Sequence, residues 1–337
     1  MDEGAGPDSS TFARLEQSVL GGPRVLSIAE LAARLEAPPE RLVALWQAFG
    51  LPEDPDAKVF TEYDAAVVGR QLAGSDTGEL SPTVAASLVR SVNHLTDRLA
   101  VWQVETLVEH LAQRYGLDDV TARILLLDRL ADAVPLLEEQ LVHAWRHHLV
   151  NHAARTASQV ATVGHVPDPT RLPLARAVGF ADVVSFSART AGLPAAELAD
   201  VVQRFESRAR DVVSLAGGRT VKTIGDAVFF VADEAAVGAR VALDLADAFG
   251  PDSPTPVRVG VVWGQVLARF GDVYGPPVNL AARLTSEAEP CTVLTDEATA
   301  AELAPDPALT TTPLAERAVA GFGRVRPVRL DRAARTT

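Results

Sequence analysis

Cysteine and long apolar runs are almost missing from this 337-residue chain, and each shortage excludes a class of protein. The single cysteine, Cys291, excludes an intrachain disulfide framework and fits a reducing compartment. No apolar stretch approaches the roughly 20 residues that a membrane-spanning helix needs. The first ten residues are acidic and polar, unlike a secretory signal. We therefore expect a cytoplasmic protein without a transmembrane segment.

Positive charge is also scarce, because 31 lysines and arginines face 44 aspartates and glutamates, for a formal net charge of -13. The basic residues are scattered among acidic ones and form no basic run. A chain of this charge repels nucleic acid and anionic membranes, so we expect no nucleic-acid partner. The hydrophobic content of 47% and the length predict two globular domains, each with its own core.

Lysine is the rarest basic residue, and one of the only two lysines, Lys222, lies in the segment Gly217–Asp226. Arginine offers a broad charged fork, whereas lysine offers a compact ammonium that can point at a single acceptor such as a ring nitrogen. Four residues later, Asp226 follows a glycine at a predicted strand-to-strand turn. A carboxylate at such a turn can face a metal ion.

The first half of the chain has the apolar spacing of helices. Residues 1–25 show little periodicity and predict a flexible lead-in, and residues 26–164 predict an all-helical domain. Ser27 and Glu30 have the spacing of a capping box at a helix start. Long helices are expected over residues 82–115 and 119–162.

The proline-rich stretch 165–174 predicts a linker, and residues 175–332 predict a second domain of different character. Strands and helices alternate there, and two tight strand-to-strand turns require antiparallel pairs, so we expect an α+β fold. The expected strands are 175–186, 219–224, 227–231, 257–262, 265–270 and 292–295. The expected helices are 194–215, 234–249 and 278–288.

Polar residues interrupt three apolar segments of this second domain. Asp182 lies in an apolar strand end and, with Asp226, has the ligand chemistry of a Mg²⁺ or Mn²⁺ site. Asn279 and Arg283 are four residues apart on a predicted helix, so their side chains share a face that can hold a sugar and a phosphate. Asp272 lies in a glycine-flanked loop. Taken singly, each is better explained as an ordinary turn or strand-end residue or as part of a solvated helix face.

Taken together, the segments containing Asp182, Lys222–Asp226 and Asp272–Arg283 resemble the class III nucleotidyl cyclase homology domain from about Ala177 to Leu330. The resemblance implies a ferredoxin-like βαββαβ core. It also implies that Asp182 and Asp226 bind two metal ions, Mg²⁺ or Mn²⁺. In the same resemblance Lys222 and Asp272 read adenine, Asn279 orients the ribose and Arg283 stabilises charge at the reacting phosphate.

The resemblance further implies an adenylyl cyclase that converts ATP to cyclic AMP as a homodimer. In such cyclases one subunit supplies the metal aspartates and the other supplies the remaining residues, so the active sites lie at the subunit interface. Guanylyl cyclases of the family carry residues such as Glu and Cys at the two base-reading positions, so Lys222 and Asp272 favour ATP. Ser185 departs from the glycine that many members have after the first strand.

All seven histidines precede the second domain, and four of them, His143, His147, His148 and His152, lie on the expected helix 119–162. Because the ordinary pKa of histidine lies near neutrality, mild acid can charge this helix. The histidines equally fit a solvated helix face, and the i, i+4 pairs have metal-ligand spacing without further ligands nearby. The helical half also resembles the autoinhibitory domain of actinobacterial acid-activated adenylyl cyclases, which implies a pH-regulated domain and leaves room for a lipid or small apolar ligand.

Two other functions are compatible with parts of the sequence. One is a catalytically silent cyclase fold that serves as a nucleotide sensor or scaffold, and the six occupied positions speak against it. Residues 26–51 also match two short helices joined by a tight connection, as in a helix-turn-helix DNA-binding regulator. The second of these helices carries only Arg41 as a base-reading cation, which favours packing over DNA recognition.

Overall fold

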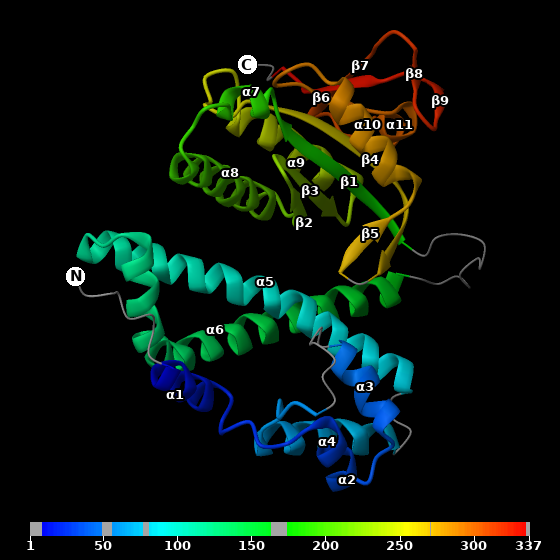
Figure 1. Cartoon of the computed structure of the whole chain (residues 1–337). Coiled ribbons are helices and arrows are strands. Elements are labelled where there is room, and N and C mark those ends of the chain that lie inside the picture. The colour runs from blue at the N-terminus through cyan, green and yellow to red at the C-terminus, as the bar shows by residue number, and fades with distance from the viewer. Residues whose placement is uncertain (1–8, 49–55, 77–80, 163–173, 270, 335–337) are drawn as a thin grey trace. The chain divides into compact units, whose positions relative to one another are not determined.

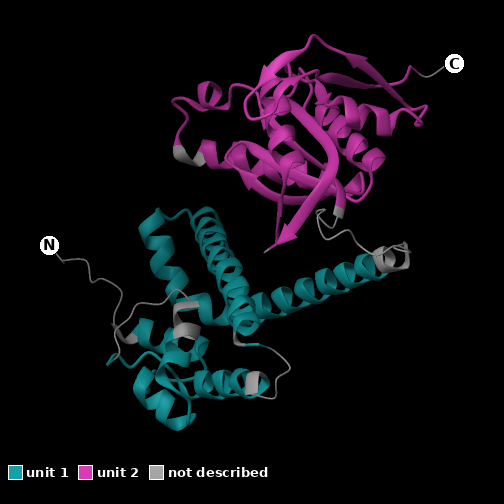
Figure 2. Cartoon of the chain, turned by 90° about the vertical axis from the view of Figure 1, so that its right-hand side faces the viewer, with its two compact units in different colours: residues 1–164 teal, residues 165–337 magenta. Residues whose placement is uncertain are grey.

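The chain divides into two compact units, residues 1–164 and 165–337, which are considered separately below (Figure 2). The computed structural model describes residues 9–48, 56–76, 81–162, 174–269 and 271–334. The expected linker lies outside the described residues, except that its last residue, Leu174, begins the first strand. None of the described helices has both the length and the apolar character that crossing a membrane requires.

The described part of the first unit is helical, as its apolar periodicity predicts. Its helices are α1 (Ser9–Val19), α2 (Ile28–Arg34), α3 (Pro39–Ala48), α4 (Glu62–Asp76), α5 (Pro82–Tyr115) and α6 (Asp119–Thr162) (Figure 1). The bounds of α5 and α6 agree with those expected. The capping box of α2 is also confirmed, since the backbone N–H of Ser27 donates to Glu30 at 2.7 Å and that of Glu30 to the Ser27 hydroxyl at 3.3 Å.

The expectation of a flexible lead-in over residues 1–25 is wrong where the structure describes it, because α1 occupies much of that stretch. The reason lies in tertiary packing, which a short window of sequence does not reveal. Helix α1 lies against α6, and its Leu15 is buried. Burial of an apolar side chain stabilises a short helix whose own propensity is marginal.

Helices α2 and α3, the pair with helix-turn-helix spacing, pack together around an apolar cluster. Leu31 from α2 and Leu42 from α3 are both buried in it, together with Phe60 and Leu72. Arg41 also forms an interaction within the chain. The described part of α3 therefore contributes to a core, which is the structural role expected for it.

The second unit is built on a mixed sheet with strand order β2-β3-β1-β4-β6-β10-β7, and β5 pairs with β4. A separate small hairpin is formed by β8 and β9. The strands are β1 (Leu174–Val183), β2 (Arg219–Ile224), β3 (Ala227–Ala232), β4 (Val257–Arg269), β5 (Asp272–Tyr274), β6 (Val293–Thr295), β7 (Leu309–Pro313), β8 (Arg317–Val319), β9 (Gly323–Val325) and β10 (Val328–Arg332). The helices are α7 (Phe186–Thr190), α8 (Ala195–Leu215), α9 (Ala235–Ala248), α10 (Pro276–Glu287) and α11 (Glu297–Leu303). The expected α+β fold is confirmed.

The sheet is covered on both faces, and the side chains of β1 alternate between two cores as the pleat requires. Ala177 and Ala181 belong to the core that contains α8 and α9. Val178 and Phe180 belong to the core that contains α10. The helix α10 therefore lies on the opposite face from α9, directly against β1 and β4.

The expected break between strands 257–262 and 265–270 is wrong, because β4 is one continuous strand of 13 residues. It pairs with β1 without interruption, from Val183 opposite Val257 to Leu174 opposite Val266. Gly264 has another role there: a Cβ at this position would lie 2.6 Å from Cγ of Pro277 in α10. The glycine permits close packing of a helix on the strand, and the tight turn comes later, between β4 and β5.

Candidate functional site

The two candidate metal-binding aspartates lie side by side where strand β1 ends and strand β3 begins. Asp182 is near the end of β1, opposite Ala227 of β3, and Asp226 occupies the turn between β2 and β3. The backbone N–H of Val183 donates to the carbonyl oxygen of Asp226 at 3.2 Å. Loss of solvent raises the pKa of Asp226 above its ordinary value, and the negative charge of Asp182 raises it further.

Arg258 lies beside these two aspartates, although the family resemblance does not mark it as a site residue. The Arg258 guanidinium donates to Asp182 Oδ2 from Nε at 2.9 Å and from Nη2 at 2.7 Å. Its Nη1 also donates to the carbonyl oxygen of Ser286 in α10, at 2.9 Å. Arg258 faces Asp182 because the two residues are partners in the β1–β4 register. The available signal was an arginine within the apolar strand 257–262.

The two candidate base-reading residues are brought together although 50 positions separate them. Lys222 on β2 donates to Oδ2 of Asp272, the first residue of β5, in an ion pair. The other carboxylate oxygen, Oδ1, accepts a hydrogen bond from the backbone N–H of Val273 at 2.9 Å. Although burial alone would raise the pKa of Asp272, these hydrogen bonds and the Lys222 charge hold it below its ordinary value. The Lys222 side chain is 41% exposed and that of Asp272 20%, so both side chains are reachable from solvent.

Asn279 and Arg283 lie on the exposed face of α10, one turn apart as expected. Within the described ranges neither side chain has a hydrogen-bond or ion-pair partner. The opposite face of α10 is anchored by Thr285, whose hydroxyl donates to the carbonyl oxygen of Ala281 at 2.8 Å and also lies 3.3 Å from that of Phe180. The helix is thus fixed to the sheet while two polar side chains point away from it.

One chain brings the six positions together only in part. The carboxylates of Asp182 and Asp226 form one cluster, and the Lys222–Asp272 ion pair forms another. The described residues show no hydrogen bond or ion pair between these clusters, or from either to Asn279 and Arg283.

Comparison with known proteins identifies the family. The model of the adenylate and guanylate cyclase catalytic domain matches residues 175–330. An adenylate cyclase of Glutamicibacter nicotianae is 42% identical over 331 residues, 95% of this chain and 82% of that protein. The chain belongs to the class III nucleotidyl cyclases. An adenylate cyclase of Streptomyces coelicolor is 37% identical to this cyclase, over 86% of this chain and 74% of that protein.

A pH-sensitive adenylate cyclase of Mycobacterium tuberculosis is 29% identical to this cyclase, over 76% of this chain and 64% of that protein. In the present cyclase His143, His147, His148 and His152 are all exposed on α6. The rings of His143 and His147 are adjacent, with centroids 4.5 Å apart and planes tilted by 55°. Across the described ranges, no cluster of three or more His, Cys, Asp or Glu side chains is arranged to hold a metal ion.

The donor set of Asp182 and Asp226 nevertheless fits the metal ions of cyclase chemistry. Burial first, and the nearby Asp182 charge in addition, disfavour the ionised form of Asp226, and a divalent cation between the two carboxylates would offset both effects. Mg²⁺ and Mn²⁺ accept carboxylate oxygens and take their other ligands from water and substrate phosphates. Two protein carboxylates are therefore enough when a nucleotide triphosphate supplies the rest.

Ser185 occupies the position where many cyclases have glycine, and its backbone explains the preference. Its φ of 57° and ψ of 36° lie in the left-handed region, which glycine adopts without strain and serine does not. The residue precedes α7, directly after the strand that carries Asp182. Ser185 therefore adopts a backbone conformation that ordinarily favours glycine.

Proposed function

We propose that this cyclase converts ATP to 3′,5′-cyclic AMP and pyrophosphate, acting in the cytoplasm as a homodimer. The observation that carries the proposal is the ion pair between Lys222 and Asp272. It sets a donor and an acceptor side by side at a partly exposed position. The names of the similar proteins, which are adenylate cyclases, support the same substrate.

The chemistry of this pair selects adenine. Lys222 has three ammonium donors, of which one serves Asp272, so another can donate to a ring nitrogen. Asp272 keeps acceptor capacity beyond its bonds to Lys222 and Val273, so it can accept from the exocyclic amine. Guanine presents the opposite donor and acceptor pattern on that edge. It would leave polar groups unpaired at about 1–3 kcal/mol each.

The other residues act on the ribose and phosphates. The ribose 3′-hydroxyl attacks the α-phosphorus, and the bond to the pyrophosphate oxygen breaks. Asp182 and Asp226 would hold the divalent ions, Mg²⁺ or Mn²⁺, which supply positive charge that acidifies the hydroxyl and neutralises the triphosphate. Asn279 orients the ribose. Arg283, which is free of protein partners within the described residues, meets the negative charge that grows in the transition state.

A two-fold dimer would join the separate clusters into complete sites. The aspartates of one chain would face Lys222, Asp272, Asn279 and Arg283 of the partner, and symmetry would give two such sites. The exposure of Asn279 and Arg283 supports this arrangement, because unpartnered polar side chains on a fixed helix are free to meet another surface. A monomer should be inactive.

The decisive experiment assays the purified chain with ATP or GTP and Mn²⁺ or Mg²⁺, with the product identified by chromatography. We expect cyclic AMP from the wild type and none from Asp226→Ala or Arg283→Ala. Mixing these two inactive variants should restore about a quarter of the wild-type rate, since half of the dimers are mixed and each holds one intact site of two. If the wild type makes no cyclic nucleotide under any of these conditions, a role as a nucleotide sensor is favoured instead. If the wild type is active but the mixture of the two variants is not, the shared-site arrangement is refuted.

We further propose that the helical unit restrains the cyclase and releases it in mild acid. The support is the cluster of exposed histidines on α6, where protonation would place like charges next to each other, with Arg146 between them. The name of the M. tuberculosis relative supports the same regulation. Rates measured from pH 5.5 to 8 should rise toward acid in the wild type. They should change less when His143, His147, His148 and His152 are replaced by glutamine. Equal rates across the range would refute this regulation.

A further inference from the structure

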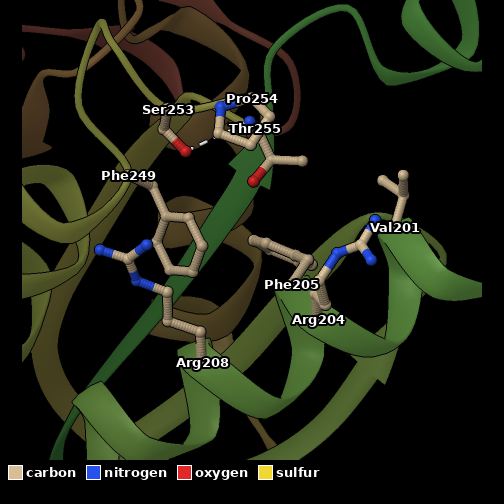
Figure 3. A pocket seen from close by; sticks show the side chains of 8 residues that line it. All are labelled: Val201, Arg204, Phe205, Arg208, Phe249, Ser253, Pro254 and Thr255. Carbon is tan, nitrogen blue, oxygen red and sulfur yellow. Dashed lines mark hydrogen bonds between the residues drawn. The ribbon is translucent and has the colours of Figure 1, made fainter.

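A cavity of about 320 Å³ opens on the catalytic unit between helix α8 and the segment that joins α9 to β4 (Figure 3). None of the six candidate site residues lines it. Its walls come from about two turns of α8 and from the residues just before β4. The lining residues are Val201, Arg204, Phe205, Arg208, Phe249, Ser253, Pro254 and Thr255. The volume is that of a site for a small organic molecule.

The inner walls of this cavity are apolar and well fixed. The rings of Phe205 and Phe249 pack edge to face, with centroids 5.1 Å apart and planes at 61°. Both residues are almost fully buried in the main core of the unit, 3% and 2% exposed, so only a small part of each ring borders the cavity, in a fixed position. Val201 and Pro254 extend the apolar lining (Figure 3). An apolar body, and an aromatic one above all, would be desolvated here against a preformed surface.

The polar groups that line the cavity favour a ligand with a negatively charged group. The Arg208 guanidinium lies over the Phe249 ring, 5.3 Å from its centroid, and has no acidic partner in the described ranges. Arg204 has only a long contact with Asp200, at 3.5 Å, and is largely exposed. The two arginines lie one turn apart on α8, and Figure 3 shows their guanidinium groups on opposite sides of the aromatic pair, with Arg208 beside Phe249.

A third polar group, the Thr255 hydroxyl, lies deeper. Thr255 is 8% exposed, and its Oγ1 points into the cavity between the aromatic walls (Figure 3). Within the described ranges this oxygen makes no hydrogen bond and is accessible from the cavity, so it can pair with a ligand atom. Beside it, Ser253 Oγ accepts from the backbone N–H of Thr255 at 3.2 Å, which leaves the Ser253 hydroxyl hydrogen available to donate.

We propose that this cavity binds a compact carboxylate with an apolar, preferably aromatic, body. The body lies against the apolar lining of Val201, Phe205 and Phe249, and the carboxylate accepts charge-assisted hydrogen bonds from Arg208. The Thr255 and Ser253 hydroxyls form hydrogen bonds with polar atoms of the ligand that lie deeper in the cavity. This site is independent of the proposed nucleotide chemistry, so its test does not depend on cyclase activity.

The test measures binding of 2-naphthoate to the full-length wild-type chain by calorimetry, with 2-naphthamide as the uncharged isostere. We expect saturable binding of one naphthoate per chain and at least tenfold weaker binding of the amide, since a hydrogen bond to a charged group is worth about a factor of ten or more. Arg208→Gln should weaken naphthoate binding to a similar extent. Arg240→Gln, the same change at an exposed arginine on α9 outside the cavity, should not.

Two further variants keep the test decisive if Arg208→Gln disturbs the aromatic wall. Thr255→Val preserves shape and removes only the hydroxyl, and it should weaken binding several-fold. Val201→Trp fills the cavity and should abolish binding while the thermal unfolding midpoint stays within a few degrees. Equal affinities for naphthoate and naphthamide would overturn the proposal. Unchanged affinity in Val201→Trp, or no saturable binding of naphthoate at millimolar concentration, would overturn it as well.

Discussion

The seating of α10 on the sheet can be tested at Gly260, where the helix approaches β4 most closely. A Cβ at this position would lie 2.5 Å from the carbonyl oxygen of Ala281, and 2.6 Å from both the backbone nitrogen and the hydroxyl of Thr285. All three atoms belong to α10, and two of them are backbone atoms that cannot turn aside. Gly260→Ala must therefore push the helix outward, and with it Asn279 and Arg283.

The size of the effect follows from these contacts. Ordinary contact begins at 3.4 Å, so the helix must move by about 0.9 Å. Overpacking of this kind costs about 1–3 kcal/mol. For a domain of this size that lowers the unfolding midpoint by about 2 to 10 °C. A misplacement of about 1 Å in groups that position the substrate costs on the order of a hundredfold in rate. The variant should thus lose far more activity than stability.

The assay compares kcat/KM for ATP and the thermal unfolding midpoint of Gly260→Ala with those of Gly250→Ala. The control makes the same chemical change in the same unit, but its Cβ would have its nearest neighbour at an ordinary 3.4 Å. Gly250→Ala should match the wild type in both measurements. If Gly260→Ala keeps wild-type activity, the position of α10 does not control catalysis and the roles given to Asn279 and Arg283 are wrong.

Two carboxylates give predictions of opposite sign for stability. The pKa of Asp226 is raised in the folded chain, so its charge destabilises the metal-free protein above that pKa. Asp226→Asn should raise the midpoint of urea-induced unfolding at pH 7, and this gain should shrink as the pH falls through the raised pKa. Mn²⁺ should stabilise the wild type more than the variant. The pKa of Asp272 is lowered, so its stabilising contribution is present above its ordinary value, near 3.9, and lost as the pH falls through the lowered one. Asp272→Asn should lower the midpoint at pH 7, by an amount that shrinks as the pH falls through the lowered pKa, and it should reduce the preference for ATP over GTP by about tenfold. An unchanged ATP preference would show that Asp272 does not read the base.

The sequence predicts those elements whose signals are local. The helices 82–115 and 119–162 and the strand 219–224 have the expected bounds, because apolar periodicity and flanking Gly or Pro mark their ends. The error in β4 came from Gly264, where a glycine serves close packing against Pro277 rather than a turn. Both uses look the same in one sequence, since the distinction depends on a helix that comes later in the chain.

The site was predictable where residue type and order carry the information, and not where register does. Lys222 and Asp272 could be paired in advance through the family resemblance, and the structure brings them into contact. Arg258 could not, because its position opposite Asp182 is set by the pairing of β1 with β4, which a single sequence does not reveal. The packing of Leu15 on α6 is hidden for the same reason.

Arg258 differs from the other site residues because it contacts both halves of the site within one chain. It holds Asp182 through two hydrogen bonds and α10 through the carbonyl oxygen of Ser286. In the proposed dimer these two elements serve opposite active sites, so loss of Arg258 should damage both. A chain with Arg258→Gln should then restore little activity when mixed with either Asp226→Ala or Arg283→Ala, whereas those two variants restore about a quarter of the rate when mixed with each other. If mixing Arg258→Gln with Arg283→Ala instead restores about a quarter of the wild-type rate, α10 of the Arg258→Gln chain is intact. Arg258 then supports only the metal-binding aspartates.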